Sequence, residues 1–204
     1  MSKHYSSDVA FSPAVKAVQT RKGSREGYAK MEEKGGWRVA ISEDLAAFIA
    51  ERDSFYLATA SADGQPSLQH RGGPKGFLRV MDEQTLAFAD FSGNRQYISV
   101  GNLTENDRVS LFLMDYPNRR RIKIWGRARV VEDDPELLQD LSDPGYKAPV
   151  EAAMVIRLEA WDINCSKHIA PRYTEDQIVE VMQPLQDRIV ELEAELAALR
   201  QPRS

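Results

Sequence analysis

The chain has 204 residues but only one cysteine, Cys165, and three histidines. A single cysteine cannot form a disulfide within the chain, so we expect a cytoplasmic protein in a reducing environment. His4, His70 and His168 lie far apart in the sequence, and the pair of Cys165 and His168 has no second pair to complete a zinc site. We therefore expect no metal. A lone cysteine at a strand end is more often a small buried residue than a nucleophile.

Long apolar segments and an excess of positive charge are also missing. No apolar run approaches the roughly 20 residues that cross a bilayer, and the first residues lack the apolar core of a secretion signal. The net charge of −4 argues against general binding to nucleic acid or to membrane surfaces. We expect a soluble globular protein with no nucleic-acid and no membrane partner.

Motifs of several enzyme classes are absent as well. The sequence contains no P-loop, no GxGxxG, no GxSxG and no HExxH, and it shows no paired-carboxylate signature. If the protein is an enzyme, we expect a bound cofactor to supply its chemistry.

The pattern that is present changes along the chain from short helices to strands. Serine caps predict helices at 13–23, 24–35 and 42–53. Runs of β-branched and aromatic residues separated by turns predict strands at 54–61, 67–71, 77–81, 85–91, 108–115, 121–132 and 152–163. A loop entering a helix is expected at 92–106, and a short helix at 134–141. This order favours a mainly β protein, a small antiparallel β-barrel with peripheral helices.

The C-terminal segment has a different pattern, with apolar residues alternating four and three apart. From Ile178 onward they fall at Met182, Leu185, Ile189, Leu192, Leu196 and Leu199, which is a heptad seam. Pro184 is expected to kink or restart this helix. The helix either packs on its own barrel or forms a two-chain coiled coil. The expected organisation is a helical extension at 1–41, a barrel domain at 42–170 and a C-terminal helix at 171–204.

The first polar stretch that suggests a ligand is "SLQHRGGPKGFLRV", at 67–80, where a strand pattern is interrupted. Glycines let backbone N–H groups approach a ligand closely, and cationic side chains favour an anion. The alternative is an ordinary looped connection whose cations face water. The candidate ligand-binding residues are Gln69, His70, Arg71, Gly72, Gly73 and Lys75.

The second stretch is "DFSGNRQY", at 90–97, between an expected strand and an expected helix. Free N–H groups at a helix N-terminus together with a guanidinium make a site for a phosphate. The alternative is a capped helix start with an exposed arginine. The candidates here are Asp90, Ser92, Asn94, Arg95 and Gln96.

The third stretch is "NRRRIKIWGRARV", at 118–130. Strand alternation places Arg121, Lys123 and Trp125 on one face and Ile122 and Ile124 on the other. Such a basic face suits an anionic small molecule or, in the plainer interpretation, simply faces water. Nucleic acid is disfavoured because acidic residues follow and the whole chain is negative.

In their order and spacing, five stretches resemble the pyridoxamine 5'-phosphate oxidase-like family of FMN-binding split β-barrels. They are "DSFYLATA", "QHRGGPKGFL", "FADFSGNRQY", "NRRRIKIWGRARV" and "AWDINCSKHI", and the resemblance covers about 45–168. It implies a split antiparallel barrel with FMN as cofactor. It also implies a homodimer with FMN bound at the subunit interface by both chains.

The resemblance also assigns roles to residues. The run that holds the FMN phosphate in this family falls on Asn94, Arg95 and Gln96, so the arginine is kept and the family's lysine is not. The strand that reaches the partner's FMN carries Arg120 and Arg121, and Arg121 stands where glutamine is typical. We expect Arg121 to restore the missing positive charge.

Further positions are assigned to the flavin ring. Arg71 and the loop through Gly76 are expected along the isoalloxazine, with backbone groups bonding its polar edge. Trp161, Asn164 and His168 resemble the element that covers the flavin from the second subunit. His70 and His168 are the candidates for an acid or base, since histidine titrates near neutrality. The alternative for each is a histidine hydrogen-bonded in or near the core.

One departure from the family narrows the expected function. The oxidases proper end in an Arg-Leu-x-Pro-type segment for the substrate phosphate, whereas this chain reads "HIAPRY" and enters the heptad helix. The expected function is therefore an FMN-dependent oxidoreductase acting on an unidentified small molecule, rather than vitamin B6 oxidation. The alternatives are a non-catalytic protein that stores or senses flavin, and a split barrel that binds haem or a deazaflavin.

Overall fold

The computed structural model describes residues 4–200, so the outermost residues of the expected segments 1–41 and 171–204 lie outside the described part. The chain divides into two compact units. One runs to Asp115 and resumes from Arg120 to Ser166, and the other joins Tyr116–Arg119 to the chain from Lys167 onward. The first contains all the described strands and the N-terminal helices, and the second contains the C-terminal helix.

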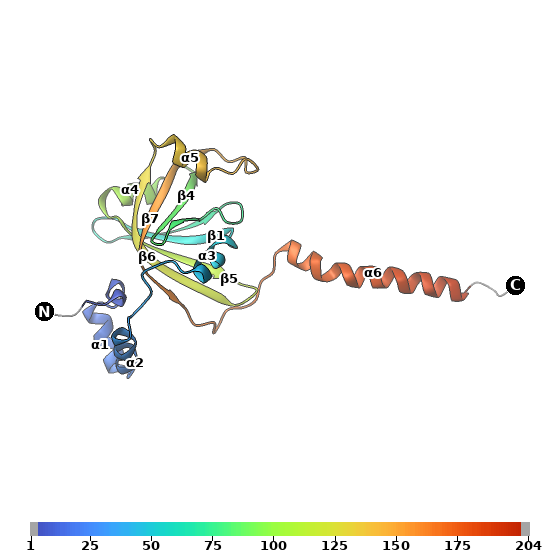
Figure 1. Ribbon diagram of the computed structural model, residues 1–204, viewed down its shortest axis with the longest axis horizontal. Coiled ribbons are helices and arrows are strands. Elements are labelled where there is room, and N and C mark those ends of the chain that lie inside the picture. Colours follow the sequence, from blue (N-terminus) through green and yellow to red (C-terminus); the bar gives the residue numbers. More distant parts are fainter. Residues whose placement is uncertain (1–3, 201–204) are drawn as a thin grey trace. The chain divides into compact units, whose positions relative to one another are not determined.

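The described residues of the first unit form seven antiparallel strands in one sheet (Figure 1). They are β1 (Ser54–Ala60), β2 (Pro66–Gly72), β3 (Arg79–Asp82), β4 (Thr85–Phe91), β5 (Arg108–Asp115), β6 (Arg120–Val131) and β7 (Val150–Ile163). Their order in the sheet is β2-β1-β5-β6-β7-β4-β3, so β2 and β3 are the two ends and the barrel is split. The expected mainly β, split antiparallel barrel is confirmed, and β4 and β5 have the expected bounds.

Helices lie around this sheet and at both ends of the chain. They are the 3-10 turn η1 (Ser6–Val9), α1 (Pro13–Arg21), α2 (Arg25–Glu33), α3 (Glu43–Ala50), α4 (Ile98–Glu105), α5 (Pro135–Leu141) and α6 (Glu175–Arg200). Ser12 and Ser42 cap α1 and α3 as expected, each accepting from a backbone N–H at 3.3 Å. Ser24 precedes α2 without a side-chain cap bond.

The core forms because strand alternation turns one row of each strand inward. In β1, Phe55 and Leu57 are buried while their neighbours are half-buried. The expected apolar face of α3 packs on the same core through Leu45, Phe48 and Ile49. The core therefore joins the sheet to α3.

A second, smaller cluster covers the opposite face of β4 and β7. It contains Ala87, Ala89, Val131, Leu141 and Ala153. Because α5 covers this face, the middle of β4 is buried on both sides and loses the alternating pattern. Leu137 N–H donates to the Asp134 side chain at 3.0 Å, so α5 is capped at the position expected for its start.

Gly126 marks an irregularity in the longest pairing, between β6 and β7. The register shifts between Trp125 and Gly126. A Cβ atom at Gly126 would lie 2.3 Å from the carbonyl oxygen of Arg157, so only glycine permits this approach of the two strands.

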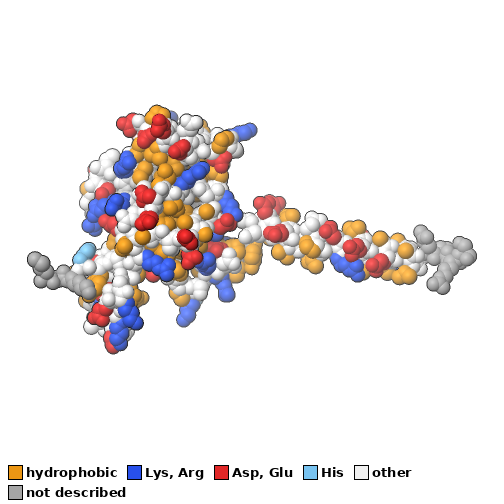
Figure 2. Space-filling view, in the orientation of Figure 1, with side chains coloured by type: hydrophobic (Ala, Val, Ile, Leu, Met, Phe, Trp, Pro, Cys, Tyr) orange, Lys and Arg blue, Asp and Glu red, His pale blue; other side chains and the backbone are white. Residues whose placement is uncertain are grey.

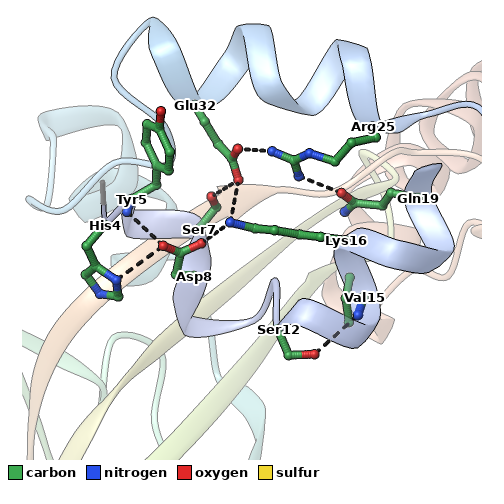
Figure 3. Close-up of polar contacts among 10 residues, drawn as sticks. All are labelled: His4, Tyr5, Ser7, Asp8, Ser12, Val15, Lys16, Gln19, Arg25 and Glu32. Carbon is green, nitrogen blue, oxygen red and sulfur yellow. Dashed lines mark hydrogen bonds and ion pairs between the residues drawn. The ribbon is translucent and has the colours of Figure 1, made fainter. Parts of the chain in front are cut away.

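The N-terminal helices are held together by a cluster of charged and polar groups (Figure 3). The Glu32 side chain is 2% exposed and pairs with Arg25 of the same helix. Ser7 donates to Glu32 at 2.9 Å, and Lys16 lies 3.6 Å from the same carboxylate. Lys16 also pairs with Asp8. This network joins η1, α1 and α2.

Aromatic side chains attach this extension to the sheet. Trp37 stacks on Trp125 of β6 with ring centroids 4.5 Å apart and planes 6° from parallel. Phe11 packs on Trp37 at 4.9 Å and on Tyr28 at 5.0 Å. The Arg38 guanidinium lies 4.8 Å from the ring centre of Trp161 in β7. The extension therefore belongs to the same compact unit as the barrel.

The second unit contains α6, which continues through Pro184 without restarting. Proline has a φ compatible with a helix and removes one hydrogen bond, so one proline need not end it. None of the described residues of α6 is buried. Among the residues described, no helix combines the length and the apolar character required to cross a membrane.

Candidate functional site

A cavity of about 320 Å³ lies between β2, the end of β4 and the start of α4. Its lining residues are Ser67, Leu68, Gln69, Arg71, Asp90, Phe91, residues 93–100, and Glu151 of β7. The fold thus brings together six residues predicted from two separate stretches of sequence: Gln69, Arg71, Asp90, Asn94, Arg95 and Gln96.

Arg71 and Asp90 form an ion pair in the wall of this cavity. Each side chain is 12% exposed. Burial raises the pKa of the Asp90 carboxyl, and the nearby charge of Arg71 opposes that rise. The guanidinium carbon of Arg71 also lies 5.8 Å from the ring centre of Phe88. The pair is therefore held firmly between β2 and β4.

The Nε atom of Arg71 is buried and has no hydrogen-bond partner in the described part of the chain. A buried donor left without an acceptor costs about 1–3 kcal/mol. A ligand with an acceptor atom in the cavity would remove this cost. Arg71 is thus both oriented by Asp90 and able to donate one more bond.

The start of α4 also lines the cavity, but it lies later than the sequence suggested. We expected the helix N-terminus near Ser92–Arg95, whereas α4 begins at Ile98. Ser92 donates instead to Glu151 at 2.8 Å, and Arg95 and Tyr97 have positive φ values of 58° and 51°. Residues 92–97 therefore form an irregular loop before the helix.

The first turn of α4 nevertheless has the properties of an anion site. Its first helical hydrogen bond is Gly101 N–H to the Tyr97 carbonyl at 2.8 Å, so the preceding N–H groups have no partner within the helix. Ile98 and Ser99 are among the residues that line the cavity. Ser99 donates to Gln69 Oε1 at 2.8 Å, which fixes α4 against β2.

Arg95 lines the same cavity from the loop. Its Nε donates to the Tyr97 hydroxyl at 3.0 Å, and its guanidinium carbon lies 6.0 Å from the Tyr97 ring centre. Asn94 accepts from the backbone N–H of Gln96 at 3.3 Å. The three residues that the sequence resemblance assigns to phosphate binding therefore all line this cavity.

His70 lies on the other face of β2. Gln69 and Arg71 are opposite the buried Leu57 and Phe55 of β1, whereas His70 is opposite Tyr56. The His70 and Tyr56 rings meet edge to face at 5.6 Å. Within one chain, His70 therefore does not share the cavity with Arg71.

The outer face of the sheet continues from His70 across neighbouring strands. Tyr56 is paired with Phe112, and Phe112 with Lys123. Lys123 is paired with Asp162 in the sheet. Burial raises the pKa of the Asp162 carboxyl, and the charge of Lys123 partly opposes that rise. The predicted alternation of β6 is confirmed, since Arg121, Lys123 and Trp125 are half-buried while Ile122 and Ile124 are buried.

Two residues of this basic face have partners within the chain. Arg121 Nε donates to the Cys165 carbonyl at 3.0 Å. Trp125 is covered by Trp37 of the N-terminal extension. The sequence offered no signal for this stack, because the two tryptophans lie in segments with unrelated patterns.

The glycine-rich loop has contacts that differ from those expected. Gly73 N–H donates to the Asp53 carbonyl at 2.9 Å, and Gly76 N–H donates to the Arg52 carbonyl at 2.8 Å. A Cβ atom on Gly73 would lie 2.7 Å from the Phe77 ring, and Gly72 pairs with Ser54 in the sheet. These N–H groups thus bond the loop to its own chain, where we expected them to face a ring.

Lys75 lies in the same loop and is 61% exposed. It pairs with Glu51 at 2.5 Å, and it is not among the residues lining the cavity. Its cation therefore faces water, as the plainer interpretation of this loop predicted.

The C-terminal candidates do not gather at the cavity either. Trp161 is 2% exposed and belongs to the core, where its Nε1 donates to the Ala40 carbonyl at 2.8 Å. Asn164 N–H bonds the Arg121 carbonyl at 3.0 Å. His168 lies in the second unit with a φ of 64°. Cys165 is exposed, which corrects the expectation of a buried cysteine.

Glu151 is a lining residue that the sequence analysis missed. It lies on β7, lines the cavity and accepts a hydrogen bond from Ser92 at 2.8 Å. Its only sequence signal is its place directly before an expected strand, which says nothing of its neighbours. Its position follows from the pairing of β4 with β7 near Asp90 and Ala152.

Known proteins resemble the chain in sequence over part of its length. A curated relative, the pyridoxine/pyridoxamine 5'-phosphate oxidase of Dichelobacter nodosus strain VCS1703A, is 30% identical over 97 residues. The match covers 47% of this chain and 42% of the relative, so the chain matches less than half of that protein.

Solved structures resemble the chain in fold. The FMN-binding protein of Syntrophomonas wolfei aligns with a TM-score of 0.50 and 14% identity, over 72% of this chain and 97% of that one. HupZ of Group A Streptococcus aligns with a TM-score of 0.50 and 18% identity, over 65% of this chain and 99% of that one. At these identities the likeness concerns the fold alone.

The family assignment rests on the barrel sequence itself. The family model described as pyridoxamine 5'-phosphate oxidase matches residues 41–165, which is more than half of the chain. The matched range contains every strand found in residues 4–200 and all the residues that line the cavity. The chain belongs to the pyridoxamine 5'-phosphate oxidase family.

Proposed function

We propose that the protein is an FMN-dependent oxidoreductase that acts on a small molecule and works as a homodimer. The observation that supports this most directly is the cavity beside β2. The buried Nε–H of Arg71, which has no acceptor among the described residues, and the first turn of α4 both line this cavity. FMN is an anion with a phosphate at one end and a ring edge rich in acceptors. When bound, it supplies hydride and electron transfer.

The residues of the cavity fit such a ligand in charge and in hydrogen bonding. Arg71 and Arg95 supply two cations, and the first N–H groups of α4, which have no partner within the helix, favour an anion. Asp90 and Glu151 add two carboxylates, but Asp90 is paired with Arg71 and Glu151 accepts from Ser92. The donors available to a ligand therefore include Arg71 Nε, the Arg95 guanidinium and backbone N–H groups.

The homodimer is proposed because the two sets of candidate residues face opposite sides of the sheet. Arg71 turns toward the core side of β2, whereas Lys123 belongs to the row that contains His70 and Tyr56. One chain cannot direct both faces at one flavin. A second copy would supply Arg121 and Lys123 to the flavin held at the cavity of the first.

The roles proposed for the chain's own residues are binding and orientation. Asp90 orients Arg71, Ser99 and Gln69 hold α4 against β2, and Arg95 binds the phosphate end. His70 on the outer face is available as a proton donor or acceptor only to a site completed by the second copy. The proposal assigns no acid–base residue within the cavity itself.

The proposal is tested by titrating the apo protein with FMN and following its fluorescence and absorbance. We expect saturation at about one FMN per chain and a sedimentation coefficient of a dimer. Reduction of the bound flavin by NADH or NADPH, followed by reoxidation with repeated turnover, would support an oxidoreductase.

Other outcomes distinguish the alternatives. Tight FMN binding without turnover by any reductant would favour a protein that stores or senses flavin. A protein that ignores FMN but binds haem or a deazaflavin would refute the cofactor assignment. A monomer that binds FMN with full affinity would refute the shared site.

A further inference from the structure

The C-terminal helix α6 has a continuous apolar seam, and none of the described residues of this helix is buried. The seam residues are Ile178, Met182, Leu185, Ile189, Leu192, Leu196 and Leu199. Their exposed fractions lie between 41% and 81%, and Figure 2 shows hydrophobic side chains spaced between charged ones along the helix. Seven large apolar side chains exposed at heptad spacing are typical of a helix that pairs with another helix.

We propose that α6 pairs in parallel and in register with α6 of a second copy of this chain, as a two-stranded coiled coil. In this register, Met182, Ile189 and Leu196 occupy a positions. The d positions are Ile178, Leu185, Leu192 and Leu199. Leucine at successive d positions with a β-branched residue at the central a position favours two parallel strands. This inference does not depend on the proposed cofactor or activity.

The charges that flank the seam favour this occupant. In a parallel pair, each g residue faces the e residue five positions later on the other helix. Arg188 then faces Glu193, and Glu195 faces Arg200, so every charged g–e contact is attractive. By symmetry each contact occurs twice. A foreign helix would match this pattern only by coincidence.

An antiparallel arrangement would make fewer attractive contacts between the charged side chains of the two helices. With the same seam it would place Arg188 against Glu195 and leave Glu193 and Arg200 without a cross-helix partner. Within one chain, Arg188 already contacts Glu191 at 2.8 Å and Glu195 at 3.7 Å. The gain from a partner helix therefore comes chiefly from Glu193 and Arg200. Only the parallel arrangement places Glu193 against Arg188, and Arg200 against Glu195, of the other helix.

Pro184 does not interrupt the seam. It occupies a c position, on the outer side of the helix, and α6 continues through it. Two heptads, 185–199, follow the proline without another break. So short a coiled coil is weak alone, and joining two chains elsewhere would raise the effective concentration of the helices.

The pairing is tested by disulfide trapping in the full-length chain. Cys165→Ser removes the native thiol, and Leu192→Cys then places one cysteine at a d position, which faces its own counterpart only in a parallel, in-register pair. The matched control is Ala194→Cys, an outward f position on the same turn. We expect Leu192→Cys to cross-link about tenfold faster or more, because its sulfur atoms stay within bonding distance.

Charge exchange in the same Cys165→Ser, Leu192→Cys chain tests the register. Arg188→Glu alone and Glu193→Arg alone should each slow cross-linking several-fold, by about 1 kcal/mol of lost attraction, and the double variant should restore it. If Arg188→Glu is instead rescued by Glu195→Arg, the helices are antiparallel and the proposal is wrong.

The remaining outcomes also decide the matter. Equal, slow cross-linking of Leu192→Cys and Ala194→Cys would overturn the proposal, with the seam covered by the chain's own barrel or by a different partner. Binding of the unmodified protein to phosphatidylcholine vesicles, lost in Leu192→Asp, would assign the seam to a membrane and overturn it too. Because the readout is local to α6, it does not depend on whether FMN binds.

Discussion

Two clusters of buried charge in the first unit differ in whether every buried donor and acceptor has a partner. At the N-terminus, both oxygens of Glu32 accept bonds, one from Ser7 and one from Arg25, and Asp8 accepts from Lys16 and from a backbone N–H (Figure 3). Beside β2, the pair of Arg71 and Asp90 leaves Arg71 Nε without a partner at the wall of a cavity. A closed cluster holds the fold together, whereas an open one has a bond left for a ligand.

The carboxylates of the two clusters differ in pKa for the same reason. Burial alone would raise the pKa of Glu32, but hydrogen bonds from Ser7 and Arg25 and the charges of Arg25 and Lys16 hold it below its usual value. The bond from Lys16 similarly lowers the pKa of Asp8. At Asp90 burial outweighs Arg71, and the pKa is raised. The direction of each pKa shift follows from the balance between burial, which raises the pKa, and the hydrogen-bond donors and positive charges that lower it.

The largest effect is expected at the open cluster. Arg71→Ala should weaken FMN binding about 100-fold, because it removes the spare donor and leaves Asp90 buried without its cation. Arg71→Lys should lose about tenfold, since it keeps the charge but not the Nε donor. FMN titration of the purified apo protein measures both.

Lys75→Ala is the matched control for these variants, because Lys75 lies on the neighbouring loop, pairs with Glu51 and faces water. It should bind FMN as the unmodified protein does. If Arg71→Ala also binds FMN unchanged, the cavity is not the flavin site.

The closed cluster should respond in stability instead. Glu32→Ala should lower the free energy of unfolding by about 2 kcal/mol, less than for a fully buried pair because Arg25 and Lys16 remain 21% and 30% exposed. Chemical denaturation gives the total, and hydrogen exchange should show the loss in α1 and α2. FMN affinity should stay the same, and a large fall in affinity would contradict the separation of the two clusters.

Acid should affect the two clusters with opposite signs. Glu32 and Asp8 have lowered pKa values, so they stabilise the fold at neutral pH and lose that contribution as pH falls through the acid range. Asp90 has a raised pKa, so its ionised form costs stability, and that cost disappears as pH falls. Unfolding free energies of the apo protein measured between neutral pH and pH 3 or so test this contrast.

Two variants separate these contributions. Glu32→Gln should make the dependence of stability on pH flatter, and Asp90→Asn should make it steeper. Identical slopes for both variants would show that the two carboxylates do not differ as described.

The smallest effect is expected on the outer face of β6. Arg121→Ala should weaken FMN binding about fivefold, because its guanidinium would contribute charge to a flavin held mainly by the other chain. Arg129→Ala on the same strand is the control, since Arg129 is an exposed arginine that lies farther along β6. Unchanged affinity in Arg121→Ala would remove the outer face, and with it the shared site, from the proposal.

Local patterns predicted the elements well where one strand face is buried and the other is not. β4 and β5 have the expected bounds, and the alternation of Arg121, Lys123 and Trp125 with Ile122 and Ile124 is confirmed. The start of α4 was misplaced, because Ser92 bonds Glu151 on a distant strand rather than capping the helix. A cap signal cannot reveal a competing partner 59 residues away.

Single residues at the candidate site were harder to assign than elements. Trp161 was expected over a cofactor, but it lies in the core because the Ala40 carbonyl, 121 residues earlier in the chain, accepts from its indole. The glycines at 72 and 73 were expected to face a ligand, whereas their backbone pairs with β1 and the residue before it. Residue type alone does not distinguish these uses.

The amino-acid sequence by itself determined the family, the split barrel of antiparallel strands and the heptad seam of α6, because each of these follows from periodicity and local motifs. Only the tertiary structure decided which polar side chains share a cavity. The register of β2 on β1 turns Arg71 inward and His70 outward, and the pairing of β4 with β7 brings Asp90 and Glu151 to the same wall. A register is a property of two strands together, so one strand's sequence cannot contain it.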